Sequence, residues 1–454
     1  MKQAASPSGS QKGHLNVSTI HHENTPSTTL LSRVTCPHCW HKFPPDETKW
    51  VSVHQDLKGD ERLDASGSKE SPRRFFPTRF NVEGLALDVR GQICRETACP
   101  HCHLSVTRAS LELPPSIVSI IGSPGSGKSY FLASMLWQAR KTLSGKFDLS
   151  FADADLKLNA MVNGYESLLF MQDEEDGLIQ IAKTQEAGDL YDLVYFENNR
   201  TVNYAKPFLF TVKPESFHPY AAKLTKSSRL LVLYDNAGEH FSPDKNHPDQ
   251  PGTGHLEHAQ VLFFLFDPTQ HPQFRRECRK FSTDPQLTDS TKVNSQHILL
   301  NEAGSRVRQW TGLSHTQKDK RPLVVIVTKY DVWGPMLSSL LPKELSLDSV
   351  VFRSRQGISG LRVEELARVS KIVERFLREH TPEIVTAAHA LSEEVVFVPV
   401  SSIGTSPVTH PDPDKKGGFY VRSGSIKPQW AEVPLLYALH RTSKGLIPGL
   451  KAKS

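Results

Sequence analysis

A glycine-rich stretch in the first third of the chain has the residue types and spacing that hold phosphate groups. Residues 122 to 129 read GSPGSGKS, a complete GxxxxGKS pattern. The glycines let backbone N–H groups converge on the phosphates of a nucleotide, Lys128 can reach the β- and γ-phosphates, and the Ser129 hydroxyl can ligate Mg²⁺. That reach also makes Lys128 a candidate catalytic residue. The residues that we expect to contact the nucleotide here are Gly122, Gly125, Ser126, Gly127, Lys128, Ser129 and Tyr130.

The residues on both sides of this loop predict the elements that position it. An apolar run from Ile117 to Ile121 precedes the loop and predicts a strand. After the loop, apolar residues recur with helical spacing, at Phe131, Leu132, Met135, Leu136 and Leu143. The positive end of that helix would face the phosphates. An accidental glycine-rich turn is the alternative, and the flanking strand and helix argue against it.

Four cysteines occur as two copies of one short motif. The sequence CPHC spans Cys36 to Cys39 and again Cys99 to Cys102. Each tight turn can aim both of its sulfurs at one ion, so the two motifs predict a four-thiolate tetrahedral site for structural Zn²⁺. The expected ligands are Cys36, Cys39, Cys99 and Cys102, with Cys94 as an alternative ligand. His38, His101 and His103 are interpreted as turn residues, because four thiolates already saturate the ion.

Redox chemistry is the competing interpretation of these motifs. CPHC also resembles the active site of disulfide oxidoreductases, in which the first cysteine sits at a helix N-terminus that lowers its pKa. Here residues 40 to 45 read WHKFPP, which cannot continue a helix. Metal binding is therefore favoured.

Basic and aromatic residues are mixed in a segment between the two CPHC motifs. Residues 73 to 80 read RRFFPTRF, a mixture that occurs on nucleic-acid-binding surfaces. A plain strand of the small metal-binding module explains the same residues, and we favour it over nucleic-acid binding.

Length and composition indicate a soluble protein with two folded units. The chain has 454 residues, 38% of them hydrophobic and 23% charged, and a net charge of +5 that points to no particular partner. No apolar run approaches the roughly 18 residues of a membrane span, and the first 35 residues lack the apolar core of a signal peptide. We therefore expect a cytoplasmic protein with a disordered tail over residues 1–33 and a frayed tail over 443–454.

Apolar runs further along the chain end in polar residues that suit a nucleotide site. The run from Leu230 to Tyr234 ends in Asp235, followed by Asn236, Ala237 and Gly238. In this DxxG pattern Asp235 would hold Mg²⁺, generally through a water, and the Gly238 N–H could approach the γ-phosphate.

Two later runs end in residues that could read a guanine base. Residues 328 to 331 read TKYD, and a carboxylate at Asp331 can accept the N1–H and N2–H₂ bonds that guanine offers and adenine lacks. The Lys329 stem could lie across the base. After the strand predicted at 395–400, backbone N–H groups of the turn at Ser401 and Ser402 could contact the guanine O6.

In their order along the chain, GSPGSGKS, DNAG, TKYD and VSS resemble the GTPase motifs of the translation-factor and Ras-like class of P-loop proteins. The likeness implies an α/β P-loop GTPase domain over residues 116–442, a mostly parallel sheet with helices on both faces, behind a zinc-ribbon-like module at 34–113. With two CxxC motifs in front, the chain looks most like bacterial zinc-ribbon GTPases of the double-GTPase group, in signalling or conflict systems. The class implies GTP or GDP with Mg²⁺ as ligands and a protein partner, either an activator or a second GTPase.

The resemblance assigns roles residue by residue, with three departures. It implies phosphate and Mg²⁺ roles for Lys128 and Ser129, switch roles for Asp235 and Gly238, and base-reading roles for Lys329 and Asp331, with Thr328 as a further candidate for nucleotide binding. Thr328 replaces the usual asparagine, whose amide buttresses the phosphate loop. No switch threonine is identifiable before Pro207, Thr201 being a weak candidate. Glu239 stands where many relatives have glutamine, and it is the second candidate catalytic residue.

Two other functions stay open from the sequence. One is a nucleotide-binding scaffold that hydrolyses little and signals through assembly. The other is an ATPase, although common ATPases place a second carboxylate beside the strand-end aspartate, where this chain has Asn236.

Overall fold

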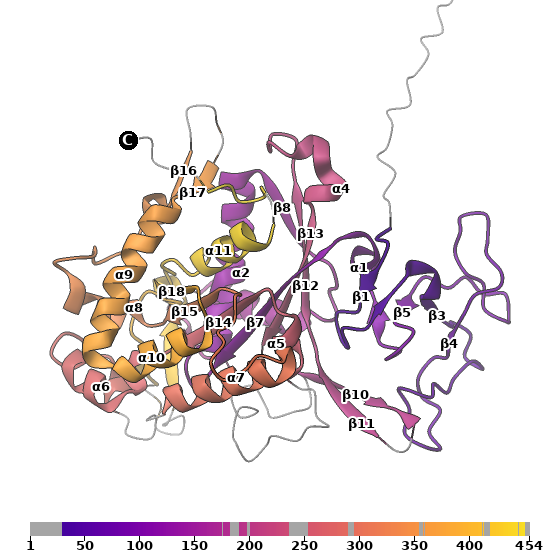
Figure 1. Cartoon of the computed structure of the whole chain (residues 1–454), viewed down its shortest axis with the longest axis horizontal. Coiled ribbons are helices and arrows are strands. Elements are labelled where there is room, and N and C mark those ends of the chain that lie inside the picture. The colour runs from indigo at the N-terminus through magenta and orange to yellow at the C-terminus, as the bar shows by residue number, and fades with distance from the viewer. Residues whose placement is uncertain are drawn as a thin grey trace, which may run out of the picture.

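The computed structural model describes residues 30–174, 176–181, 190–197, 200–235, 253–288, 295–353, 357, 359–410, 412, 418–443 and 445–449. Within these ranges an N-terminal module of short strands, β1 (Val34–Thr35) to β6 (Ser105–Val106), lies beside a larger body of helices around a central sheet (Figure 1). The fold is a mixed α/β fold with a mostly parallel sheet, as expected from the sequence.

The larger body is built on a seven-stranded sheet. From one edge to the other its strands are β18 (Val395–Pro399), β15 (Leu323–Val327), β14 (Val261–Phe266), β7 (Pro115–Gly122), β13 (Arg229–Asp235), β12 (Phe208–Pro214) and β8 (Leu149–Asp153). The strands from β18 to β13 are parallel, and β12 runs antiparallel to both of its neighbours. β14 and β15 are buried along their whole length, as is typical of parallel strands covered on both faces.

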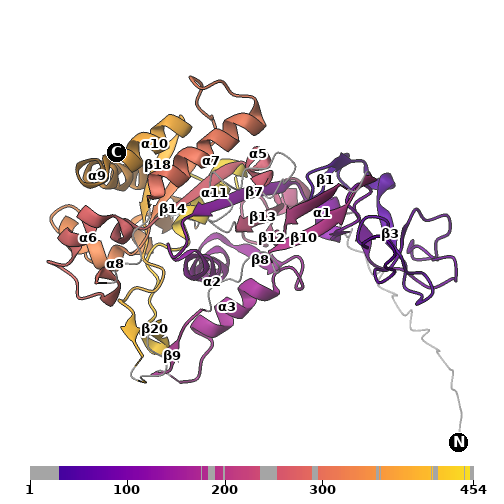
Figure 2. The same ribbon diagram turned by 90° about the horizontal axis from the view of Figure 1, so that it is seen from below.

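Helices cover both faces of this sheet (Figure 2). On one face α2 (Lys128–Phe147) packs against α11 (Val433–Thr442), and α3 (Ala160–Phe170) packs on α2. The other face carries α5 (His255–His258), α7 (Gln296–Thr311) and α10 (Pro382–Leu391), while α9 (Val363–His380) packs on β18. The remaining short helices are α1 (Arg108–Glu112), α4 (Leu224–Ser227), α6 (Pro272–Cys278) and α8 (Tyr330–Trp333).

The other strands form small sheets. In the larger body these are the hairpins β10 (Tyr191–Tyr195) with β11 (Thr201–Ala205) and β16 (Val351–Arg353) with β17 (Ser359–Leu361), and a sheet of β19 (Val408–Thr409), β20 (Phe419–Arg422) and β9 (Leu178–Ile179). In the N-terminal module β1 (Val34–Thr35) pairs with β2 (Lys42–Phe43), and a second sheet has the order β4 (Arg74–Phe75), β3 (Lys49–Val51), β5 (Thr97–Ala98), β6 (Ser105–Val106).

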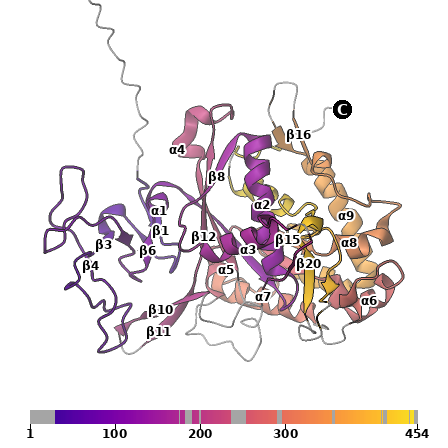
Figure 3. The same cartoon turned by 180° about the vertical axis from the view of Figure 1, so that it is seen from behind.

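The N-terminal module is docked on the larger body. Several of its buried residues, among them Cys36, Trp40, Phe43 and Cys102, belong to the same hydrophobic core as the central sheet. The β10–β11 hairpin reaches along the module (Figure 3), and the Tyr195 N–H donates to the Arg62 carbonyl at 2.8 Å. The Arg62 guanidinium lies 4.8 Å from the centroid of the Phe196 ring, a cation–π contact. The two units therefore share a packed interface in addition to the connecting chain.

The described end of the chain is packed. Leu446 and Ile447 are buried, and His218 Nε2 lies 3.2 Å from the Leu446 carbonyl. The frayed tail expected from residue 443 therefore does not include residues 445–449, because their apolar side chains join the core. Residues 1–29 and 450–454, to which both tail predictions extend, lie outside the described ranges. None of the helices within those ranges combines the length and apolar character that a membrane span needs.

Candidate functional site

The parallel strands bring most of the predicted site residues to one edge of the sheet. The carboxyl ends of β7, β13, β14, β15 and β18 lie at the same edge, because these neighbouring strands are parallel. The chain leaves β7 toward β13 on one side and later adds β14 on the other, so β7 is a topological switch point. In open α/β sheets ligands bind outside the carboxyl ends of the strands at such a point.

The phosphate loop, residues 122–129, follows β7 directly. Gly125 and Gly127 have φ angles of 72° and 86°, which glycine adopts without strain. A Cβ on Gly122 would lie 3.0 Å from Ser126 Oγ and 3.1 Å from the Leu265 side chain, so a larger residue there would require these neighbours to shift. Helix α2 begins at Lys128, so the N–H groups of its first turn point toward the loop.

Side chains of the loop close it internally. Lys128 Nζ donates to the carbonyls of Gly122 at 2.9 Å and Ser123 at 3.2 Å. The Ser126 Oγ atom is buried and has no hydrogen-bond partner among the described residues. The Tyr130 hydroxyl accepts from the Ile181 N–H at 3.0 Å, so it holds the chain at β9 beside α2. A buried hydroxyl without a partner is costly, and Ser126 therefore suits a ligand oxygen.

Two glutamines that the sequence analysis missed support this loop. Ser123 Oγ lies 3.1 Å from Gln270 Oε1 and 3.3 Å from Gln296 Oε1, and its single proton serves one of them at a time. Gln296 also accepts from the Asp267 N–H at 3.0 Å and donates to the Asp267 carbonyl at 2.7 Å. All four of these residues are at most 3% exposed. Gln296 thus links the loop to the end of β14.

Thr328 stands where the motif usually has asparagine, and its side chain contacts the neighbouring strand instead of the phosphate loop. Thr328 Oγ1 donates to the Phe266 carbonyl at 3.2 Å, so its side chain holds β14 beside β15. The amide groups that contact the phosphate loop are those of Gln270 and Gln296. No pattern in the sequence marks these glutamines, because they follow different strands and meet the loop only through the fold.

Asp235 ends β13 beside the phosphate loop. Its side chain is buried, and its Oδ1 atom has no hydrogen-bond partner among the described residues. Burial raises the pKa of Asp235 to about 6, and the charge of Lys128 opposes that shift. A buried carboxylate oxygen without a partner fits a cation. Gly238 and Glu239 lie outside the described residues.

The residues predicted to read the base lie at the ends of β15 and β18. Asp331 Oδ1 accepts a hydrogen bond from the Ser401 hydroxyl, and the Ser401 Oγ accepts from the Gly404 N–H at 2.8 Å. Burial raises the pKa of Asp331. The Ser402 carbonyl accepts from Ser134 Oγ of α2 at 2.7 Å, which ties this turn to the helix that follows the phosphate loop.

Lys329 is held by a buried carboxylate that the sequence analysis missed. Its backbone is in the left-handed region, with a φ of 59°. Its ammonium forms an ion pair with Asp267 Oδ2 at 2.7 Å, and it donates hydrogen bonds to Thr269 Oγ1 at 3.0 Å and Gln286 Oε1 at 2.6 Å. Asp267 is fully buried, and its Oδ1 accepts from the N–H and hydroxyl of Thr269.

The four cysteines of the two CPHC motifs form one cluster. Their sulfur atoms all lie within 4.8 Å of one another, and the pairs Cys36–Cys102 and Cys39–Cys99 are 3.8 Å and 3.7 Å apart. A tetrahedral ion with Zn–S distances of 2.3 Å would place its sulfurs about 3.8 Å apart. The close pairs join different motifs, whereas a redox CxxC pair would join two cysteines of one motif. The donor set and its spacing fit a tetrahedral metal site.

The two motifs have matching turns. Trp40 N–H donates to the Cys36 carbonyl, and His103 N–H to the Cys99 carbonyl, each at 3.1 Å. In each motif an N–H donates to the first sulfur at 3.4 Å, from His38 and from His101. Such bonds stabilise thiolate over thiol.

The remaining candidates near the cluster have other partners. Cys94 is outside the cluster, and its thiol donates to the Gln92 carbonyl. His38 Nε2 lies 3.1 Å from the Ser105 carbonyl, and His103 Nδ1 lies 2.8 Å from Asp60 Oδ1. His101 stacks on His41 at 4.9 Å.

The segment of basic and aromatic residues, 73–80, forms little regular structure. Only Arg74 and Phe75 lie in a strand, β4. Phe76 and Phe80 are each 54% exposed, and Lys49 Nζ lies 5.3 Å from the Phe76 ring. The plain strand expected for this segment therefore does not explain why these two rings are exposed.

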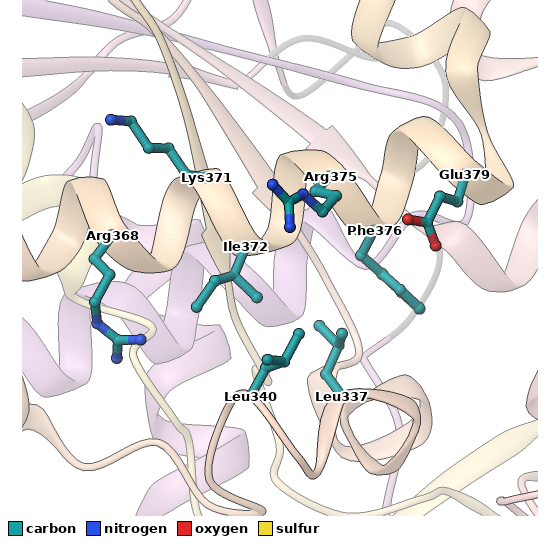
Figure 4. A pocket seen from close by; sticks show the side chains of 8 residues that line it. All are labelled: Leu337, Leu340, Arg368, Lys371, Ile372, Arg375, Phe376 and Glu379. Carbon is teal, nitrogen blue, oxygen red and sulfur yellow. The ribbon is translucent and has the colours of Figure 1, made fainter.

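A groove lies apart from these residues. It has a volume of about 300 Å³ and lies between α9 and the turn at Leu337 and Leu340 (Figure 4). Charged side chains of α9 line its rim, namely Arg368, Lys371, Arg375 and Glu379. None of the predicted site residues lines it.

No family model matches the chain, and no curated protein matches it in sequence. Solved structures to which it is similar include Sup35 complexed with GDP, the S. cerevisiae Ski7 GTPase-like domain bound to GTP, and Aquifex aeolicus Era bound to GDP·AlF4−. Each is 12% identical, with TM-scores of 0.20, 0.28 and 0.21. The alignments cover 67%, 73% and 64% of this chain, which in turn spans only 41%, 51% and 52% of those chains. Similarity this low does not show what the chain does.

Proposed function

We propose that this chain binds guanine nucleotides with Mg²⁺ and hydrolyses GTP as a molecular switch. The observation that carries the proposal is the convergence at one sheet edge of three groups: a GxxxxGKS loop at a helix start, a buried carboxylate at Asp235, and a second carboxylate at Asp331. These are the parts needed for the phosphates, the metal ion and the base, respectively. The function rests on the resemblance of these motifs to those of P-loop GTPases.

The phosphate end of the site would act through positive charge and N–H groups. Lys128, which now donates to its own loop carbonyls, would turn to the β- and γ-phosphates and stabilise charge that develops during hydrolysis. Ser126 Oγ and the first N–H groups of α2 would bind phosphate oxygens.

Mg²⁺ would be held by Ser129 and Asp235. The residues fit this ion, because Asp235 offers a buried carboxylate oxygen without a partner and Ser129 is the second residue of α2, beside the loop. When bound, the ion would neutralise charge on the phosphates.

The base end would select guanine. Asp331 would accept from the guanine N1–H and N2–H₂, with Ser401 orienting the carboxylate through its own hydrogen bond. Lys329, held at its ammonium by Asp267, would present its stem to the base. Backbone groups at Ser401 and Ser402 would lie near the guanine O6.

The proposed water-positioning residue is Glu239, which follows the DxxG glycine in the sequence. A glutamate accepts a hydrogen bond from the attacking water but cannot donate one, and its charge would oppose that of the γ-phosphate. We therefore expect slow intrinsic hydrolysis, with an acceleration of roughly 10³–10⁵ when a partner supplies an arginine. An activator or a second GTPase is the proposed partner.

The four cysteines would hold structural Zn²⁺ in the N-terminal module. Their spacing and the cross-motif pairing support this ion over a disulfide. A zinc module before a GTPase domain is the arrangement of the bacterial double-GTPase group, to which we propose that the chain is related.

A comparison of the affinities for GDP and ADP tests the proposal. We expect GDP to bind far more tightly than ADP, measured by titration calorimetry, and Lys128→Ala to abolish binding of both. Equal affinity for ADP and GDP would instead favour the ATPase. A chain that binds GTP but shows no turnover, with or without candidate partners, would be the nucleotide-binding scaffold.

A further inference from the structure

The turn of the first CPHC motif is in direct contact with the strand that carries Asp235. Trp40, the residue after Cys39, places its indole against β13 and α5. Its Nε1–H donates to the Tyr234 hydroxyl at 3.0 Å, and its ring stacks on His258 at a centroid distance of 5.4 Å. The module therefore contacts the larger body through the turn that would surround the metal.

Tyr234 is bonded twice to this turn. Its hydroxyl accepts from Trp40 and donates to the carbonyl of Pro37, which lies between Cys36 and Cys39. Tyr234 is fully buried, so water cannot replace either hydrogen bond without a rearrangement. The position of the tyrosine hydroxyl is thus set by the shape of the first CPHC turn.

Tyr234 also sits next to the proposed metal ligand. It immediately precedes Asp235, and successive side chains of a strand point to opposite faces. Anchoring the tyrosine on one face therefore fixes the rotation of the strand end and the direction of the carboxylate. The Tyr234 ring further stacks on His255 at 4.8 Å, and His255 Nδ1 lies 2.7 Å from Ser119 Oγ on β7.

We propose that Trp40 and Tyr234 are positioning residues for Asp235, so that the metal-loaded cysteine cluster strengthens Mg²⁺-dependent nucleotide binding. This inference rests on the proposed function. If the cysteines lost their ion, the turn that carries Pro37 and Trp40 would relax and leave a buried hydroxyl without partners. The end of β13 would shift to relieve that cost, and Asp235 would lose its alignment.

Conservative variants test the coupling. Tyr234→Phe removes both hydroxyl bonds and keeps the ring, and Trp40→Phe removes the indole N–H donor. Trp50→Phe is the matched control, because Trp50 lies in β3 of the same module and packs on Phe80 at 6.4 Å. Each protein is checked for zinc by elemental analysis and titrated with fluorescent GDP, once in saturating Mg²⁺ and once in EDTA.

The ratio of the two affinities is the readout. We expect Tyr234→Phe to lower the ratio of GDP affinity in Mg²⁺ to GDP affinity in EDTA roughly fivefold, the effect of one or two lost hydrogen bonds. The affinity in EDTA and the zinc content should stay unchanged. Trp40→Phe should act in the same direction, and Trp50→Phe should change nothing. A purely structural role of Tyr234 would instead lower affinity equally in both conditions, and that result would overturn the inference.

The reverse effect provides a second test. Coupling of two binding sites is reciprocal, so Mg²⁺–GDP should slow the removal of zinc by a colorimetric chelator in the unaltered chain and not in Tyr234→Phe. A removal rate that ignores nucleotide in the unaltered chain would overturn the inference alone. Absence of any guanine-nucleotide binding, with or without Mg²⁺, would overturn the proposed function and this inference with it.

Discussion

The ammonium group of Lys329 lies 2.7 Å from the Oδ2 atom of Asp267, a fully buried carboxylate at the end of β14. The pair joins the two strands at the edge where the phosphate loop and the base-reading residues meet. Because the ammonium also donates hydrogen bonds to Thr269 and Gln286, the lysine head is fixed and its stem is held in one place.

Loss of this carboxylate should therefore weaken both fold and site. We expect Asp267→Asn to lower the free energy of unfolding by roughly 1.5–3 kcal/mol, because the ammonium keeps its charge and loses its counter-ion. Urea denaturation measures this change. Asp267→Asn combined with Lys329→Met should recover part of it, and a double variant no better than the single one would contradict the pairing.

The support of the phosphate loop by Gln296 can be tested separately from the base. Gln296→Leu removes the amide that lies 3.3 Å from Ser123 Oγ and bonds the backbone of Asp267. We expect about fivefold weaker GDP binding, the cost of a lost hydrogen bond of about 1 kcal/mol. The preference for GDP over ADP should stay as it was, since Asp331 is untouched. A changed base preference would show that the substitution disturbs the whole edge.

The raised pKa of Asp235 predicts that the stability of the chain depends on pH. Its carboxyl has a pKa of about 6 in the folded chain against an ordinary 3.8, so the folded state holds its proton more tightly than the unfolded one. The nucleotide-free chain should therefore lose stability as pH rises from about 4 to about 6, by up to about 3 kcal/mol, and remain level above that.

Binding should follow the opposite trend. Below pH 6 a proton competes with Mg²⁺ for Asp235, so the strengthening of GDP binding by Mg²⁺ should fall by up to about tenfold per pH unit. Asp235→Asn should remove both dependences. Titrations of GDP at several pH values, with and without Mg²⁺, check this, and a flat profile in the unaltered chain would exclude Asp235 as the ligand.

Asp331 should determine the choice of base. Asp331→Asn should weaken GDP and favour xanthosine diphosphate, because an amide can donate to the xanthine oxygen that replaces the guanine amino group. Competition of the two nucleotides for one labelled ligand measures the reversal. Ser401→Ala, which removes only the hydroxyl that bonds Asp331, should weaken GDP less and leave the preference for guanine.

The cysteine cluster should carry about one Zn²⁺ per chain. Cys99→Ser should lower the metal content and destabilise the N-terminal module, since structural zinc can contribute roughly 10 kcal/mol or more to the folding of a small module. Cys94→Ser is the matched control and should keep the ion, because Cys94 lies outside the cluster. Fresh, reduced protein without metal would contradict the site.

The sequence by itself determined those parts of this protein whose chemistry is local. The GxxxxGKS loop requires its glycines at Gly125 and Gly127 because of their positive φ angles, and the apolar runs around it form β7 and α2 as predicted. The duplicated CPHC motif likewise predicted the four ligands, because each turn aims its own two sulfurs in one direction. The loop and each turn are made by neighbours in the chain, whereas the meeting of the two turns is a contact between distant segments.

Only the tertiary structure decided the contacts between distant segments. Gln296 is 173 residues from Ser123. In the sequence Asp267 is only the polar residue that follows an apolar run, and nothing there marks it as the partner of Lys329. Nor could spacing reveal that Trp40 of the cysteine module bonds Tyr234, 194 residues away, because burial of a hydroxyl against a turn depends on how two units dock. Hydrophobic patterning specifies which faces are covered, and packing of whole elements selects the side chains that meet there.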